Sequence, residues 1–142
     1  LKIDVTGGEQ DCDLRIWRDM VKRRIVNIFQ PDVMYMGGLT KALKAAKIIE
    51  DGGFFCTPHT ANLSLVTICT MHFLKAINNA GPYLEFSIEG ADYYPWQQNL
   101  FLGDPFKISN GKVEIDDTPG WGVDINPEWL SKSEYKKSEF EI

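Results

Sequence analysis

The sequence predicts an α/β fold in which short parallel strands alternate with helices and form an open sheet or a barrel. Four short apolar runs each carry or precede an ionisable residue, and apolar residues at helical spacing lie between the runs. The four ionisable residues are Glu9, Asp32, His59 and Glu85. Their separations of 23, 27 and 26 residues match one strand, one helix and two loops, so we expect them at one rim.

Four strands are expected. The first contains Ile3 and Val5 and runs into two glycines that allow a sharp turn. Residues 25–30 and 54–57 form the next two, and the latter is nearly all apolar, as a strand buried on both faces should be. Residues 83–89 alternate between apolar and polar side chains, which predicts a fourth strand that carries Glu85.

Three helices are predicted between these strands, and each follows a residue that favours helix N-termini. The expected N-caps are Asp11, Thr40 and either Asn62 or Ser64. Leu14, Trp17 and Val21 form the apolar stripe of the first helix, which we expect to cover the sheet. His72 lies on or beside the stripe of the third helix, where a packing role is more common than a catalytic one.

Residues 90–142 follow a different pattern, because the helix that should come after the fourth strand is absent. Residues 106–115 predict a β-hairpin with Asn110-Gly111 as its two-residue turn. The run 118–130 contains too many prolines and glycines for a long element and is expected to pack against another part of the protein. Residues 131–142 are mixed in charge and are expected to be solvated.

Composition excludes several classes of protein. The chain has 142 residues, 44% of them hydrophobic, which suits one soluble domain with a core. A net charge of -5, with no basic cluster longer than Lys22-Arg23-Arg24, argues against a nucleic-acid partner. No apolar stretch approaches the roughly 20 residues that span a bilayer, so no membrane association is expected.

The three cysteines, Cys12, Cys56 and Cys69, are odd in number and follow no metal-ligand spacing. A disulfide framework or a zinc site is therefore not expected. Each is interpreted as a small buried hydrophobic residue, and a reducing cytoplasm fits this usage.

The four strand-end groups suggest a chemistry if they share a pocket. A carboxylate beside a histidine can orient the imidazole and raise its basicity, which suits proton transfer near neutral pH. A further carboxylate on the same rim could hold a hard cation such as Mg²⁺. Polar groups at strand ends are also common in any α/β protein, so spacing alone leaves a catalytic and a structural interpretation open.

Five strings add to this pattern when they are taken in order. They are GGEQ at 7–10, QPDVMYMGGLTKALKAAKIIEDGG at 30–53, TPHT at 57–60, YLEF at 83–86 and GKVEIDDTPGWGVDINPEWL at 111–130. Together they resemble the C-terminal half of the mandelate racemase and muconate lactonising branch of the enolase superfamily, over roughly residues 3–130.

The resemblance implies the C-terminal half of a modified TIM (β/α)7β barrel. It assigns about four parallel strands and three covering helices to residues 1–89. It assigns residues 90–142 to an irregular C-terminal segment with a β-hairpin, which packs on the barrel or on a capping domain.

The resemblance also implies the chemistry of the superfamily, in which a base removes the proton α to a carboxylate and Mg²⁺ stabilises the enediolate. Glu9 matches the last of three metal-binding carboxylates. Asp32 and His59 match an Asp/His dyad in which His59 is the general base or acid. Glu85 matches an acid that hydrogen-bonds the substrate carboxylate, which requires surroundings that keep it protonated.

Three functions remain open for the protein. The first is a Mg²⁺-dependent acid-sugar dehydratase that yields a 2-keto-3-deoxy sugar acid from a small carboxylate substrate. The second is a racemase or epimerase in which His59 works opposite a lysine. The third is a non-catalytic half-barrel that serves as a binding or structural module.

The family supplies a lysine pair and two further metal carboxylates from strands that would precede Leu1. We therefore expect the chain to be a fragment that is inactive alone, with the remaining barrel and capping portion of the same protein as its partner.

A homo-oligomer is also expected, and the aromatic stretch 93–101 would suit a subunit or domain contact. Four residues are candidates either for the pocket lining or for ordinary loop structure: Gln10, Tyr35, Asn62 and Trp96.

Overall fold

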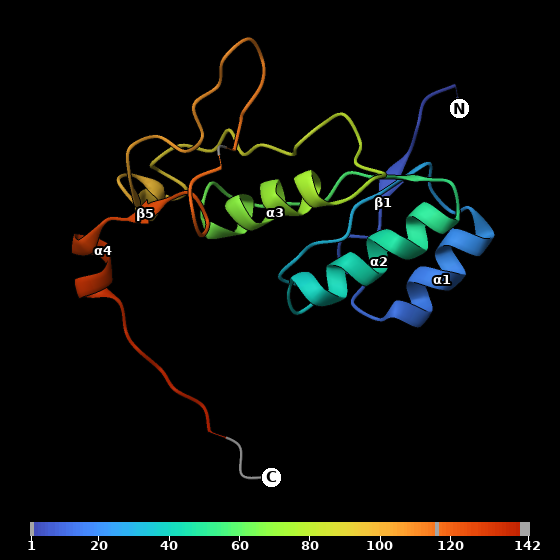
Figure 1. Cartoon of the computed structure of the whole chain (residues 1–142), viewed down its shortest axis with the longest axis horizontal. Coiled ribbons are helices and arrows are strands. Elements are labelled where there is room, and N and C mark those ends of the chain that lie inside the picture. The colour runs from blue at the N-terminus through green and yellow to red at the C-terminus, as the bar shows by residue number, and fades with distance from the viewer. Residues whose placement is uncertain (1, 116, 140–142) are drawn as a thin grey trace.

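The computed structural model describes residues 2–115 and 117–139 (Figure 1). Strands and helices alternate along its first half in the order β1 (Thr6–Gly7), α1 (Leu14–Arg23), β2 (Ile28–Phe29), α2 (Leu39–Asp51), β3 (Phe55–Cys56) and α3 (Leu65–Ala76). The second half holds a short 3₁₀ turn η1 (Pro95–Gln97), then β4 (Phe101–Leu102), β5 (Asp124–Ile125) and α4 (Pro127–Lys132).

The three strands of the first half form one parallel sheet in the order β1, β2, β3. Backbone bonds extend the pairing past the strand ends, since the Asn27 N–H donates to Val5 O at 2.8 Å and the Gln30 N–H to Gly7 O at 3.0 Å. Three parallel strands, each followed by a helix, confirm the predicted α/β class.

The fourth strand was predicted in the wrong place. Within the described residues, 83–89 form no strand, and the sheet instead continues as a single parallel bridge between Cys56 and Ala80. The Gly81 N–H still donates to Cys56 O at 2.8 Å. Within the described residues no further bond extends this pairing to 83–89.

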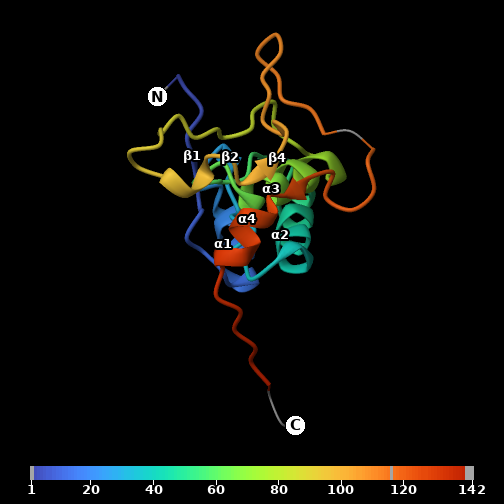
Figure 2. The same cartoon turned by 90° about the vertical axis from the view of Figure 1, so that its left-hand side faces the viewer.

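Helices α1 and α2 pack side by side against the sheet (Figures 1 and 2). Trp17 and Phe29 are fully buried at the centre of the core, with ring centroids 6.1 Å apart. The Trp17 indole N–H donates to Asp11 O at 3.0 Å. Gly8 has a φ of +103° and passes under this ring, where an added Cβ would lie 3.0 Å from Trp17, so the turn after β1 requires glycine.

Two of the predicted helix caps differ from those observed. Asp13, not Asp11, caps α1, because its side chain accepts the Arg15 N–H at 2.8 Å. Gly38 precedes α2 without a side-chain cap, and Thr40 lies inside the helix. Ser64 caps α3 as predicted and accepts the Val66 N–H at 3.2 Å.

Helix α3 also packs on a second apolar cluster in the C-terminal half. Ile68 and Met71 of α3 meet buried Phe101 of β4 there. His72 has the packing role that was expected, with Nε2 3.1 Å from Trp121 O and its ring edge-to-face with the indole. The division of the chain between residues 89 and 90 stays a prediction.

The expected hairpin is present as a tight turn. Asn110 and Gly111 both have positive φ, at 52° and 73°, as a two-residue hairpin turn requires. The ladder is limited to the bridge between Ser109 and Lys112. The short helix α4 was not foreseen, although Asn126 caps it and Pro127 begins it.

After α4 the chain leaves the body of the molecule (Figures 1 and 2). Residues 133–139 are exposed, in line with the expected solvated tail, and residues 140–142 lie outside the described part. Among the described residues, no helix is long and apolar enough to cross a membrane.

The cysteines differ in exposure, and this difference is testable. Cys56 is fully buried and burial raises its pKa to about 12, whereas Cys12 is exposed, contrary to expectation. The reactive species is the thiolate, which is scarce at Cys56 until the pH approaches 12. In the native protein at pH 8 we expect an alkylating reagent to modify Cys12 first, and Cys56 only after unfolding. Peptide mass spectrometry checks this order, and equal modification rates would contradict the burial of Cys56.

Candidate functional site

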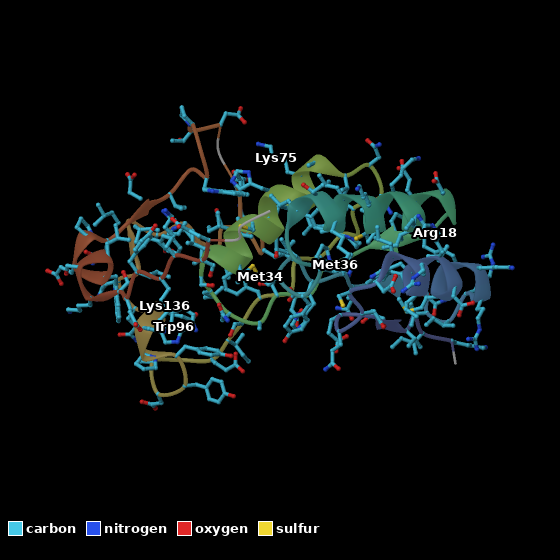
Figure 3. The ribbon with its side chains drawn as sticks, turned by 90° about the horizontal axis from the view of Figure 1, so that it is seen from below. Arg18, Met34, Met36, Lys75, Trp96 and Lys136 are labelled. Carbon is cyan, nitrogen blue, oxygen red and sulfur yellow. The ribbon has the colours of Figure 1, made fainter. Side chains whose placement is uncertain are left out.

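The loop after β2 fixes the carboxylate of Asp32. Its Oδ1 accepts the backbone N–H groups of Met34 at 2.6 Å and Tyr35 at 2.9 Å, and its residue exposure is 3%. Buried Met36 anchors the loop, while Met34 lies exposed on the same turn (Figure 3). One carboxylate oxygen is therefore held by the backbone, and the other is left to contact a partner.

That partner is His59, as the resemblance to the enolase superfamily implied. Its Nδ1 lies 2.8 Å from Asp32 Oδ2, and its side chain is 21% exposed. A neutral imidazole that donates Nδ1–H to this carboxylate has its lone pair on Nε2, the atom that can then accept a proton. The predicted dyad thus forms across 27 residues of sequence.

Glu85 is tied to the residue that follows His59. Its Oε2 accepts the backbone N–H of Thr60 at 2.9 Å. Thr60 is itself buried, and its hydroxyl lies 2.8 Å from that of Thr67 in α3. Asp32, His59 and Glu85 are therefore linked through contiguous contacts, although Glu85 is exposed and the described residues do not give it the dry surroundings that proton donation to a carboxylate needs.

Glu9 differs from the other three predicted site residues, because the described part of the chain shows no contact between it and them. It lies in a turn after β1, partly exposed, at the same edge of the sheet as the other groups because β1 is parallel to β2. Within the described ranges, no group of three His, Cys, Asp or Glu side chains is placed to hold a metal ion. Glu9 by itself is one carboxylate, and these residues do not form a magnesium site on their own.

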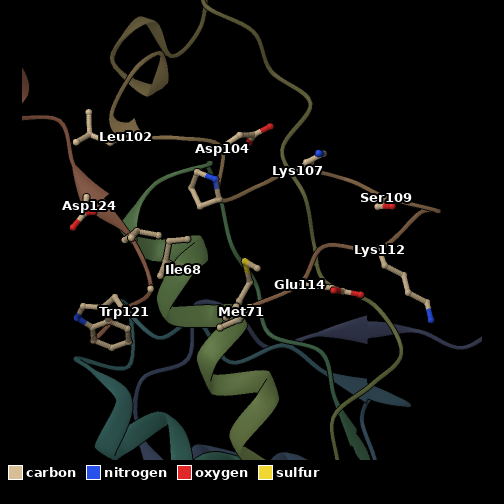
Figure 4. Close-up of a pocket in the computed structure, with 14 residues that line it drawn as sticks. Ile68, Met71, Leu102, Asp104, Lys107, Ser109, Lys112, Glu114, Trp121 and Asp124 are labelled. Carbon is tan, nitrogen blue, oxygen red and sulfur yellow. The ribbon is translucent and has the colours of Figure 1, made fainter. Parts of the chain in front are cut away.

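The four residues do not share one of the main cavities. A cavity of about 550 Å³ lies between α3 and the segment 102–124 (Figure 4). Its lining includes Ile68, Met71 and Trp121. The predicted site residues line neither this cavity nor a second one of about 400 Å³ around residues 86–106. The expected common pocket is not one of these spaces.

The four residues that were candidates for the pocket lining have different surroundings in the structure. Tyr35 stacks on His59, with ring centroids 6.0 Å apart and planes at 19°. Asn62 accepts the Ser64 hydroxyl at 2.6 Å, and Trp96 packs on Tyr94, so both have local structural contacts. Gln10 is exposed. Thr60 was missed in the sequence because it contributes a backbone N–H, which leaves no side-chain signal.

The chain is similar to a known protein family over most of its length. Residues 1–129 match the family described as enolase C-terminal domain-like. The chain belongs to this family. The resemblance to the enolase superfamily and the predicted half-barrel fold are thereby confirmed.

Individual relatives carry more specific names. The L-rhamnonate dehydratase of Saccharopolyspora erythraea is 28% identical over 127 residues, which are 87% of this chain and 31% of that protein. A crystal structure described as a "putative racemase" from Roseobacter denitrificans is 56% identical, with a TM-score of 0.93 over 99% of this chain and 38% of that one. The chain therefore spans about a third of the length of these relatives.

A third likeness shows the fold alone. The enolase from Pantoea ananatis, solved with bound D-gluconate and magnesium, has a TM-score of 0.74 and 22% identity. The match covers 92% of this chain and 31% of that one.

Proposed function

We propose that this chain is part of a Mg²⁺-dependent enzyme that dehydrates acid sugars. The observation that carries the proposal is the contact between His59 Nδ1 and Asp32 Oδ2, which directs the basic Nε2 away from the carboxylate. The name of the 28% identical relative, an L-rhamnonate dehydratase, supports the substrate class and the loss of water.

In this proposal His59 moves one proton. Its Nε2 either takes the proton α to the substrate carboxylate or delivers a proton to the β-hydroxyl as that group leaves as water. Asp32 keeps the imidazole in the productive tautomer and stabilises the imidazolium when it forms. Loss of the α-proton and the β-hydroxyl gives an enol, which becomes the 2-keto-3-deoxy acid.

Two carboxyl groups complete the assignment. Glu85 accepts the Thr60 N–H through Oε2, which leaves Oε1 free. In the full-length protein the rest of the barrel would have to cover Glu85 and keep it protonated, so that Oε1–H can donate to the substrate carboxylate as negative charge develops there. Bound Mg²⁺ would supply charge stabilisation at the same carboxylate. Glu9 would be one of its ligands, and the other ligands would come from the rest of the protein.

The test is incubation of the full-length protein with aldonic and aldaric acids, L-rhamnonate among them, in D₂O with Mg²⁺. Dehydration predicts a 2-keto acid. Exchange of the α-proton for deuterium without any keto acid would exclude dehydration. Neither product from any acid would support the non-catalytic binding module.

Racemisation or epimerisation is the second candidate, and the name of the 56% identical structure favours it. In that case His59 would exchange the proton on one face of the α-carbon, and a second base from the rest of the protein would act on the other face. Formation of the epimer, followed by chiral separation of the acids, distinguishes this outcome.

Glu85 is expected to matter for rate more than its exposure suggests. Replacing it by alanine removes a group placed to stabilise the developing charge, and such a loss typically costs about 10²- to 10³-fold in kcat. Glu89→Ala, an exposed glutamate four residues on, is the matched control and should keep its activity. Steady-state rates of α-proton exchange in the full-length protein check this. Equal rates for the two variants would rule out the role of Glu85.

A further inference from the structure

Tyr35 contacts both members of the dyad, and it does so with different parts of the residue. Its backbone N–H donates to Asp32 Oδ1 at 2.9 Å. Its ring stacks on the imidazole of His59 at a centroid distance of 6.0 Å. Tyr35 therefore contacts the carboxylate of Asp32 with its backbone and the imidazole of His59 with its ring.

The loop that carries Tyr35 is fixed on both sides. Val33 and Met36 are buried in the core, and the Met36 N–H closes the turn on Asp32 O at 2.9 Å. Gly37 and Gly38 then have φ values of 82° and 118°, which allow the chain to enter α2 at once. The backbone of Tyr35 therefore has a defined position, although the residue is 53% exposed.

The contact with Asp32 does not by itself fix the tilt of the His59 imidazole. A single hydrogen bond at Nδ1 sets the direction of that atom but does not prevent the imidazole plane from tilting about it. Contact with a ring at 19° limits this tilt, because aromatic pairs favour offset, nearly parallel faces. An imidazolium formed after proton transfer is also attracted to a ring face within about 6 Å. Asp32 is a charged group in contact with His59, and Glu85 contacts the backbone of the next residue, Thr60.

We propose that Tyr35 is a positioning residue whose ring holds the imidazole of His59 in the plane from which Nε2 meets the substrate. The proposal rests on the function proposed above, since it assigns Tyr35 to the same proton transfer. The aromatic face is the acting part, and the phenolic hydroxyl is not needed.

Three variants of the full-length protein separate the ring face from the hydroxyl and from bulk. Tyr35→Leu keeps an apolar side chain without an aromatic face, and Tyr35→Phe keeps the face without the hydroxyl. Tyr135→Leu makes the same change at an exposed tyrosine in the C-terminal tail. We expect Tyr35→Leu to lower kcat for α-proton exchange by about 10- to 100-fold with KM within about threefold, as small misplacements of a catalytic group do. Tyr35→Phe and Tyr135→Leu should stay within about threefold of the parent in kcat.

A second readout does not depend on turnover. Stacking on an aromatic ring changes the NMR chemical shifts of the His59 ring protons. These signals are identified because they disappear in the His59→Asn variant. These signals should move in Tyr35→Leu and stay in place in Tyr35→Phe. Unchanged signals in Tyr35→Leu, full kcat in Tyr35→Leu, or equal losses in the Leu and Phe variants would each overturn the proposal. A parent protein that neither forms a 2-keto acid nor exchanges the α-proton of any acid would instead overturn the proposed function.

Discussion

Replacing His59 by asparagine in the full-length protein is expected to lower kcat by about 10³- to 10⁴-fold, because general acid–base catalysis by a placed side chain contributes at this level. Asparagine cannot accept and return a proton near neutral pH. Its amide remains polar at a position that is already partly exposed, so the fold should persist. Rates of α-proton exchange and of keto acid formation check the loss, and thermal melting checks the fold.

The second histidine provides a matched control for this experiment. His72 of α3 contacts Trp121 of the C-terminal segment and not the dyad, so His72→Asn should keep kcat within about threefold while losing some stability. Turnover that survives His59→Asn as well as it survives His72→Asn would show that His59 is not the base.

Asp32→Asn should lower kcat about as much as His59→Asn does, for a different reason. The amide oxygen can still accept the N–H groups of Met34 and Tyr35, so the loop is kept. The amide NH₂ would then face His59 Nδ1 and donate to it, which places the imidazole proton on Nε2. An Nε2 that already carries a proton cannot accept another, and a wrong tautomer of this kind lowers kcat by about 10⁴-fold.

Asp51→Asn is the control for Asp32→Asn, since Asp51 is an exposed aspartate of α2 paired with Lys47. It should leave kcat within about threefold and change stability by less than about 1 kcal/mol. Full activity of Asp32→Asn would mean that the carboxylate does not set the tautomer.

The placement of Asp32 and His59 at one rim could be predicted because equal intervals separate the short apolar runs, and parallel strands bring their carboxyl ends to one edge. Their pairing as a dyad was implied by the resemblance to the enolase superfamily, and His59 Nδ1 does lie 2.8 Å from Asp32 Oδ2. The fourth strand could not be placed in the same way. Alternation in residues 83–89 indicated a strand, but the observed pairing with β3 stops at Gly81. Leu84 and Phe86 instead pack with the C-terminal cluster and Phe106.

Other features depend on contacts that no local pattern encodes. Asp11 and Asp13 are equally good N-cap residues in sequence, and Asp13 is the cap because α1 begins at Leu14, which places the Asp13 side chain against the Arg15 N–H. The Thr60 N–H that binds Glu85 and the stacking of Tyr35 on His59 arise from tertiary placement. The metal role of Glu9 stays a prediction, because it depends on ligands that the described residues do not supply.

A double-mutant cycle at the dyad is the most direct test that Asp32 and His59 act as one unit. The rate of α-proton exchange is measured for the parent protein, His59→Asn, Asp32→Asn and the double variant. If Asp32 acts only through His59, the double variant is as slow as His59→Asn alone and no slower. Losses that multiply would mean that the two residues act independently, and this would contradict the assignment of the dyad.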